Sequence, residues 1–283
     1  MSGVAQGSER FADWRAMDPR ALDDAYSNSR AVPEAQAMIA GWAGDSARLR
    51  AARPDGLDLP YGTGEREKWD LFPAADSGAP CLVFIHGGYW QRNGRESFGC
   101  FMEGALAAGW SAALPGYTLA PEASLSRIAD EIRRALDWLA AEGPRRGVAG
   151  PVVLSGWSAG GHLAALHAGH SAVRAALAIS GIFELEPIRG TTLNEKLSLA
   201  DEEIARLSPI RLPHPATPLA VAYGTAELPE LRRQSLDFHA ARSAAGGPGP
   251  LVPIEGKNHF DIMEALRAPD GELLAAARRL LAD

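Results

Sequence analysis

The sequence contains one glycine-flanked serine that could act as a nucleophile. Gly156-Trp157-Ser158-Ala159-Gly160 follows an apolar run at residues 151–155 and precedes a segment of helical composition. A serine on a tight turn between a buried strand and a helix presents its hydroxyl at the helix N-terminus, where the dipole favours developing negative charge. The motif therefore predicts Ser158 as the nucleophile of an acyl-transfer reaction. An ordinary glycine-rich turn is the alternative.

A second glycine motif follows another apolar run. His86-Gly87-Gly88-Tyr89-Trp90 comes directly after residues 81–85. Acyl transfer requires backbone N–H groups directed at the oxyanion, and a glycine pair after a strand lets the backbone turn toward the serine. We expect the N–H groups of Gly88, Tyr89 and Ala159 to form this oxyanion hole. His86 precedes the serine in the chain, so we expect it to bond loop backbone; a simple loop is the alternative for the whole motif.

The general base is expected near the C-terminus. His259 lies in Gly256-Lys257-Asn258-His259-Phe260, after the apolar segment 250–254. Loops at the carboxyl ends of parallel strands are where ligands gather in open α/β sheets. The remaining histidines fall in the segment after the serine motif, in a proline-rich loop or in a helix: His162, His167, His170, His214 and His239. His259 is therefore the predicted base.

The acid that orients the base should follow a strand between the serine and the histidine. The apolar segment 218–223 leads into residues 224–230, which contain Glu227 and Glu230. Either carboxylate could accept the imidazole Nδ1–H and fix its tautomer. Glu227 comes first and is preferred; Glu230 remains the competitor, and a surface charge is the alternative for both. The chain order serine, acid, histidine is that of an α/β-hydrolase.

Strands and helices that could position these residues alternate from residue 66 onward. Strands are expected at 66–72, 81–85, 110–114, 151–155, 173–179, 218–223 and 250–254, and helices at 98–108, 124–142, 162–169, 234–245 and 271–282. Such alternation predicts a mostly parallel sheet covered by helices on both faces. Residues 1–60 are expected to form an arm that packs near the active site, with a helix within 31–50. Residues 61–283 then form the catalytic domain.

Aromatic residues accompany both motifs. Tyr89, Trp90, Tyr117 and Trp157 could together line a pocket that accepts an aryl group. Core packing is the alternative, and it is preferred for Trp157 because the residue before the nucleophile usually points into the fold. For Tyr89 and Trp90, a place in the pocket wall and a place in the core are weighed equally.

Composition excludes several other classes of protein. The 283 residues carry 28 Lys plus Arg and 35 Asp plus Glu, a net charge of −7, which disfavours binding to nucleic acid or to anionic membranes. Two cysteines, Cys81 and Cys100, are too few for a disulfide framework or a cysteine zinc site. The first 20 residues contain no apolar core of a signal peptide, and no apolar stretch reaches 18 residues. We expect a cytoplasmic protein without metal or cofactor.

The motifs together resemble the kynurenine formamidase (arylformamidase) branch of the α/β-hydrolases. The resemblance rests on segments along nearly the whole chain: Tyr26-Ser27-Asn28, Arg30, Tyr61-Gly62, residues 69–72, 86–90, 180–187, Arg233-Gln234-Ser235 and 256–260. The Gly-Trp-Ser form of the serine motif departs from the Gly-His-Ser of animal members. Broader esterases also carry His-Gly-Gly and the pattern found here as Tyr117-Thr118-Leu119-Ala120-Pro121.

The resemblance implies a catalytic triad of Ser158, Glu227 and His259, although some members have aspartate in place of Glu227. It also implies substrate contacts from Gly87, Trp90 and Tyr26, the last from an arm that helps to close the site. The implied function is a serine hydrolase that cleaves N-formyl-L-kynurenine to formate and the free aniline. A carboxylesterase for short-chain or aryl esters is the alternative enzyme, and a ligand-binding protein on a hydrolase scaffold is the alternative class. The expected partner is a small-molecule substrate, and a homodimer is left open.

Overall fold

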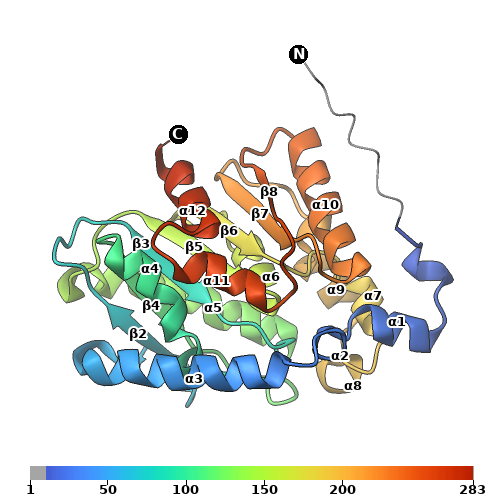
Figure 1. Ribbon diagram of the computed structural model, residues 1–283, viewed down its shortest axis with the longest axis horizontal. Coiled ribbons are helices and arrows are strands. Elements are labelled where there is room, and N and C mark those ends of the chain that lie inside the picture. The colour runs from blue at the N-terminus through green and yellow to red at the C-terminus, as the bar shows by residue number, and fades with distance from the viewer. Residues whose placement is uncertain (1–10, 283) are drawn as a thin grey trace.

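A computed structural model describes residues 11–282 of the chain. Its centre is an eight-stranded sheet in the order β1-β2-β4-β3-β5-β6-β7-β8, in which β1–β2 and β2–β4 are antiparallel and all other pairs are parallel (Figure 1). The strands are β1 Leu59–Pro60, β2 Lys68–Phe72, β3 Cys81–Ile85, β4 Ser111–Pro115, β5 Val152–Trp157, β6 Val173–Ile179, β7 Leu219–Gly224 and β8 Leu251–Ile254. The mostly parallel sheet expected from the sequence is confirmed.

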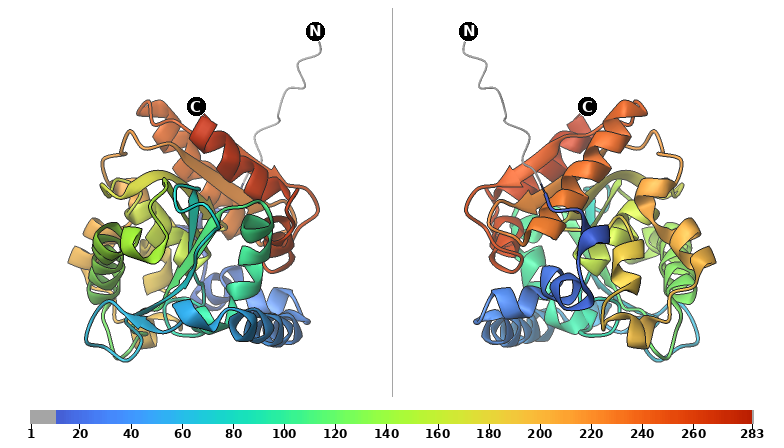
Figure 2. Two further views of the ribbon diagram at one scale, coloured as in Figure 1. Left: turned by 90° about the vertical axis from the view of Figure 1, so that its left-hand side faces the viewer. Right: turned by 90° about the vertical axis from the view of Figure 1, so that its right-hand side faces the viewer.

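Helices cover both faces of the sheet (Figure 2). One face carries α5 Leu125–Glu142, α6 Ala159–Leu166, α7 Glu186–Arg189, α8 Asn194–Leu197, α9 Asp201–Leu207 and α10 Pro229–Ala244. The other carries α3 Ala35–Ala52, α4 Glu103–Ala107, α11 Glu264–Arg267 and α12 Glu272–Ala282. The first two helices, α1 Pro19–Ala25 and α2 Asn28–Ala31, precede α3. No helix within residues 11–282 is long and apolar enough to cross a membrane.

Burial on both faces explains the central strands. Every residue of β3 is buried, and β5 is buried along its whole length. Continuous apolar runs suit such strands, because helices exclude water from both sides. Helix α5 shows the complementary pattern: its apolar positions point to the sheet, and Ser124 caps its first turn by accepting from the Arg127 amide at 3.3 Å.

Several boundaries differ from the sequence expectations. The short first strand β1 was not predicted, and it pairs with β2 through Leu59 and Trp69. Helix α6 begins at Ala159 rather than 162, because Ser158 itself occupies the N-cap position. Helix α10 begins at Pro229 rather than 234, in keeping with the preference of proline for the first helical turn.

The arm formed by α1, α2 and α3 packs against the sheet domain. Trp42 of α3 contacts Phe101 edge-on, with ring centroids 4.9 Å apart, and Trp157 at 5.8 Å. A charge network fastens the end of the same helix: Asp70 on β2 pairs with Arg50 of α3 and accepts from Arg95 Nε at 3.1 Å. The arm is thus joined to the core by both apolar contacts and ion pairs.

Removing the central carboxylate of this network should destabilise the fold. The side chains of Asp70 and Arg95 are only 2% and 4% exposed. We expect Asp70→Ala to lower the free energy of unfolding by about 1–3 kcal/mol, because it removes the buried carboxylate that Arg50 and Arg95 share and leaves Arg95 only its pairs with Asp58 and Glu96. Urea denaturation measures this, with exposed Asp55→Ala expected to change stability by less than about 0.5 kcal/mol. An equal loss of unfolding free energy in both variants would show that the ion pairs of Asp70 do not stabilise the fold.

Candidate active site

Ser158 lies on a strained turn between β5 and α6. Its backbone has φ 59° and ψ −119°, which few residues other than glycine adopt. The turn also needs its glycines: a Cβ on Gly156 would lie 2.2 Å from the Gly160 carbonyl oxygen, and one on Gly160 would lie 2.0 Å from that of Ile85. This is the strand–turn–helix geometry that exposes a nucleophilic hydroxyl.

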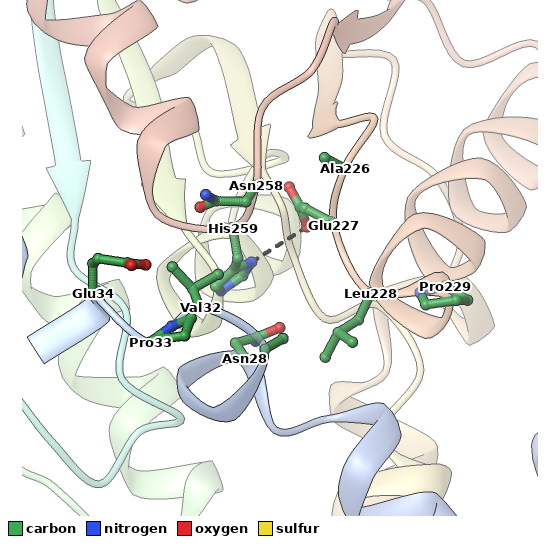
Figure 3. A pocket seen from close by; sticks show the side chains of 11 residues that line it. Asn28, Val32, Pro33, Glu34, Ala226, Glu227, Leu228, Pro229, Asn258 and His259 are labelled. Carbon is green, nitrogen blue, oxygen red and sulfur yellow. Dashed lines mark hydrogen bonds and ion pairs between the residues drawn. The ribbon is translucent and has the colours of Figure 1, made fainter.

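His259 and Glu227 come together at the carboxyl ends of β8 and β7. The His259 Nδ1 atom lies 3.3 Å from Glu227 Oε2, and both side chains are almost fully buried (Figure 3). Trp157 Nε1 donates to the His259 carbonyl at 2.7 Å and so fixes the histidine loop. A proton on Nδ1 directed at the carboxylate leaves Nε2 free to accept a proton from a substrate or a nucleophile.

Glu230 is committed elsewhere. It accepts from the Tyr26 hydroxyl at 2.9 Å and from Arg233 Nη2 at 2.9 Å. Glu227 ends the loop before α10, whereas Glu230 lies in the first turn of that helix. Of the two carboxylates left open by the sequence, the geometry favours Glu227 as the partner of His259.

Ser180 is a polar contact of this site that the sequence analysis missed. It follows β6 with φ 51°, and its hydroxyl donates to Glu227 Oε1. The Gly224 amide donates to the same oxygen at 2.7 Å. These two donors hold one carboxylate oxygen, which leaves the other for His259. The only available signal was position, since Ser180 directly follows the strand beside β5.

Loss of the Ser180 hydroxyl should impair turnover more than binding. We expect Ser180→Ala to lower kcat by about 10–150-fold with little change in KM, because a buried hydrogen bond to a charged group contributes about 1.5–3 kcal/mol. Steady-state kinetics with Ser180→Thr, which keeps a hydroxyl, should recover most of the loss. A rise in KM alone would argue against a role in orienting Glu227.

The loop after β3 presents free amides toward the serine turn. Gly88, Tyr89 and Trp90 all have positive φ, and a Cβ on Gly88 would lie 2.5 Å from the Arg92 carbonyl oxygen. The Gln91 and Arg92 amides both donate to the Gly88 carbonyl, at 3.0 and 3.1 Å. No backbone carbonyl within residues 11–282 accepts from the amides of Gly88, Tyr89 or Ala159. The three groups predicted to bind an oxyanion are therefore available for it.

His86 has the structural role expected of it. Its side chain is fully buried, Nδ1 donates to the Gly87 carbonyl at 2.9 Å, and the ring stacks on Tyr117 with centroids 4.3 Å apart. Burial lowers the pKa of His86 to about 4, so the imidazole is neutral at pH 7. The expectation that this histidine bonds loop backbone is confirmed.

Ser158 and His259 line one cavity, together with Asn28, Tyr89 and Phe260 among others. A neighbouring cavity lies between residues 28–34 of the arm and residues 226–229, and His259 lines this one too. Figure 3 shows Asn28 and Val32 beside His259. The arm thus forms a wall of the site, as expected. Among the described residues, no cluster of three or more His, Cys, Asp or Glu is arranged to hold a metal ion.

The three predicted substrate contacts lie in different positions. Gly87 backs the serine, since a Cβ there would lie 3.0 Å from Ser158 Cβ. Trp90 is a correction: it is fully buried, meets the His162 ring edge-on at 5.0 Å and does not line the cavity of Ser158, because its positive φ turns the ring into the core. Tyr26 also lies outside that cavity, since its hydroxyl is held by Glu230. Tyr89 does line that cavity, as do Trp157 and Phe260.

Comparisons with known proteins agree with this fold. The family model BD-FAE matches residues 70–196. Kynurenine formamidase of Danio rerio is 27% identical over 90% of this chain and 94% of its own, and that of Salmo salar is 30% identical over 77% and 79%. A solved structure of a thioesterase candidate from Silicibacter sp. TM1040 has a TM-score of 0.82 and 32% identity, over 91% of this chain and 98% of its own. Esterase B of Lactobacillus rhamnosis, with a TM-score of 0.67 and 19% identity over 90% and 94%, shares the fold.

Proposed function

Because the chain belongs to the kynurenine formamidase family of α/β-hydrolases, we propose that it hydrolyses N-formyl-L-kynurenine to kynurenine and formate. The observation that carries the proposal is that Ser158 and His259 line the same cavity, while Glu227 Oε2 accepts a hydrogen bond from His259 Nδ1. The proposed reaction would be a step of tryptophan catabolism. A cytoplasmic location is part of the proposal, supported by two buried cysteines that carry free thiols.

The proposed reaction proceeds through a formyl-enzyme. His259 Nε2 takes the Ser158 proton as Oγ attacks the formyl carbon, and the amides of Gly88, Tyr89 and Ala159 hold the oxyanion. The protonated imidazole, stabilised by Glu227, then gives its proton to the leaving aniline nitrogen as the C–N bond breaks. A water molecule, deprotonated by the same histidine, attacks the formyl ester. Formate leaves, and Ser158 regains its proton.

A carboxylesterase is the second candidate, favoured by the structural similarity to esterases. The same machinery cleaves activated esters, so esterase activity alone does not identify the substrate. The test compares purified protein on N-formyl-L-kynurenine and on an aryl acetate, with Ser158→Ala as control. A kcat/KM above about 10⁴ M⁻¹s⁻¹ for the formamide supports the proposal. Fast acetate hydrolysis with negligible formamide cleavage would make this chain an esterase instead.

A further inference from the structure

The peptide unit between Gly87 and Gly88 is held at its carbonyl end by two side chains. The Asn93 amide nitrogen Nδ2 donates to the Gly87 carbonyl oxygen at 3.1 Å, and His86 Nδ1 donates to the same oxygen at 2.9 Å. A carbonyl oxygen only accepts and has two lone pairs, so both are occupied and the Asn93 nitrogen must face it. Asn93 and His86 together therefore set the orientation of this peptide unit.

The other end of the same peptide unit is the Gly88 N–H group, one of the three amides expected to bind the oxyanion. The unit is planar and trans, so its C=O and N–H bonds point in opposite directions. The Gly88 N–H group therefore points away from Asn93 and His86. No backbone carbonyl within the described part of the chain accepts from it, and Gly88 lines the same cavity as Ser158.

Asn93 is itself fixed in place. Its carbonyl accepts from Arg66 Nη2, and Arg66 Nε donates to the Tyr117 carbonyl at 3.0 Å. Its φ of 72° lies in the left-handed region, which asparagine tolerates better than most residues. A Cβ added to Gly88 would lie 2.8 Å from Asn93 Nδ2, so the asparagine side chain fills the space beside that glycine. Asparagine thus combines a left-handed backbone with a donor at the Gly87 carbonyl, and glycine would supply only the first.

We propose that Asn93 is a positioning residue for the oxyanion hole, because its hydrogen bond to the Gly87 carbonyl directs the Gly88 N–H group at the developing oxyanion. The inference rests on the proposed function, since it takes Ser158 as the attacking group. Asn93 acts through the peptide unit: a donor at the carbonyl also polarises the unit and strengthens its N–H group as a donor. Because the oxyanion is absent from the bound substrate, the contribution belongs to kcat and not to KM.

Two replacements of Asn93 separate the side-chain donor from the backbone conformation. Asn93→Gly keeps the left-handed backbone but removes the donor, and we expect kcat for an aryl acetate to fall about 3–10-fold with KM unchanged. Asn93→Asp keeps the shape but places a negative oxygen against the Gly87 carbonyl, which turns the peptide unit away. We expect its kcat to fall about 10²–10³-fold, the effect of removing one oxyanion-hole donor. Wild-type kcat in Asn93→Gly would reduce the residue to its backbone conformation and overturn the proposal.

Gln91→Glu is the matched control on the same loop. Gln91 Nε2 donates to a different carbonyl, that of Leu193, at 2.8 Å, and Gln91 does not line the cavity of Ser158. The substitution makes the same change from amide to carboxylate as Asn93→Asp, and we expect it to change kcat less than about threefold. Equal losses in these two variants would mean a loosened loop or a general effect of the added charge, and would overturn the proposal.

An oxyanion formed without turnover gives a direct measure of the hole. When 2,2,2-trifluoroacetophenone binds, Ser158 Oγ adds to the ketone carbon, its proton passes to His259, and the ketone oxygen becomes the oxyanion of a hemiketal. With ¹³C at that carbon, NMR follows the ionisation of the hemiketal with pH. We expect Asn93→Gly to lower the acid dissociation constant of the hemiketal about 3–10-fold, the same factor as in kcat, and Gln91→Glu to leave it unchanged. A merely structural role would not change it.

The possible failures are distinguishable. The aryl acetate and the ketone test the oxyanion hole whatever the natural substrate is, so absent formate release from N-formyl-L-kynurenine would count against the proposed function alone. An active wild-type chain whose Asn93 variants keep its kcat and its hemiketal ionisation would overturn this inference alone. A wild-type chain that neither hydrolyses the acetate nor forms the hemiketal would overturn both.

Discussion

Replacing Ser158 with alanine is expected to lower kcat/KM for both N-formyl-L-kynurenine and aryl acetates by at least about 10⁴-fold. The hydroxyl is the proposed attacking group, and without it no formyl-enzyme forms; the remaining rate comes from the oxyanion hole and from binding. Release of formate and of the phenol, measured on the same preparations, gives the two rates.

A fluorophosphonate probe provides an independent check. Mass spectrometry should place the label on Ser158 in the wild-type chain and find none in Ser158→Ala. Label on another residue, or turnover that survives the substitution, would show that a different group attacks. The thermal transition of the variant should be no lower than that of the wild-type chain, which excludes misfolding as the cause of any loss.

Replacing Glu227 with glutamine is expected to lower kcat by about 10³–10⁴-fold. The amide keeps the volume of the side chain but lacks the charge that stabilises the imidazolium, and its NH₂ group can favour the wrong histidine tautomer. Glu230→Gln is the matched control, three residues along the chain, and should lower kcat less than about tenfold. Its carboxylate contacts Tyr26 and Arg233, not His259.

Steady-state kinetics of the two glutamine variants decides between the carboxylates. A larger effect at Glu230 would mean that the acid was assigned to the wrong residue. Similar small effects at both would mean that His259 acts without a carboxylate partner.

The sequence predicts the parts of the fold whose cause is local. Strands β3 and β6 have the predicted bounds, because a parallel strand that is buried on both faces appears in the sequence as a continuous apolar run. The short helices α7, α8 and α9 were not predicted, since helices of four to seven residues depend on tertiary packing rather than on their own propensity. The early start of α6 was also hidden, because glycines there give no helical signal.

In the site too, features with a local cause were predicted and features that depend on tertiary structure were not. Ser158 and His259 stand in motifs whose spacing predicts their loops, and these loops meet where β5 and β8 end. The direction of the Trp90 ring depends on a positive φ that its sequence neighbours do not reveal. The Ser180 contact arises only because β6 and β7 pair in parallel, which brings Ser180 beside Glu227 although the two are distant in the sequence. Contacts set by topology could not be predicted from one sequence.

The strained backbone conformation of Ser158 lowers the stability of the fold at the residue that activity requires. A residue with a Cβ in this region stores about 1–3 kcal/mol of strain. Ser158→Gly would remove that strain from the folded state. Glycine also gives the unfolded chain more conformational freedom, which lowers the gain in stability by roughly 0.5–1 kcal/mol. The inactive chain is therefore expected to melt at a higher temperature than the active one. A laboratory evolution that selected for heat resistance alone would favour loss of the nucleophile, so any such selection on this protein must also reward turnover.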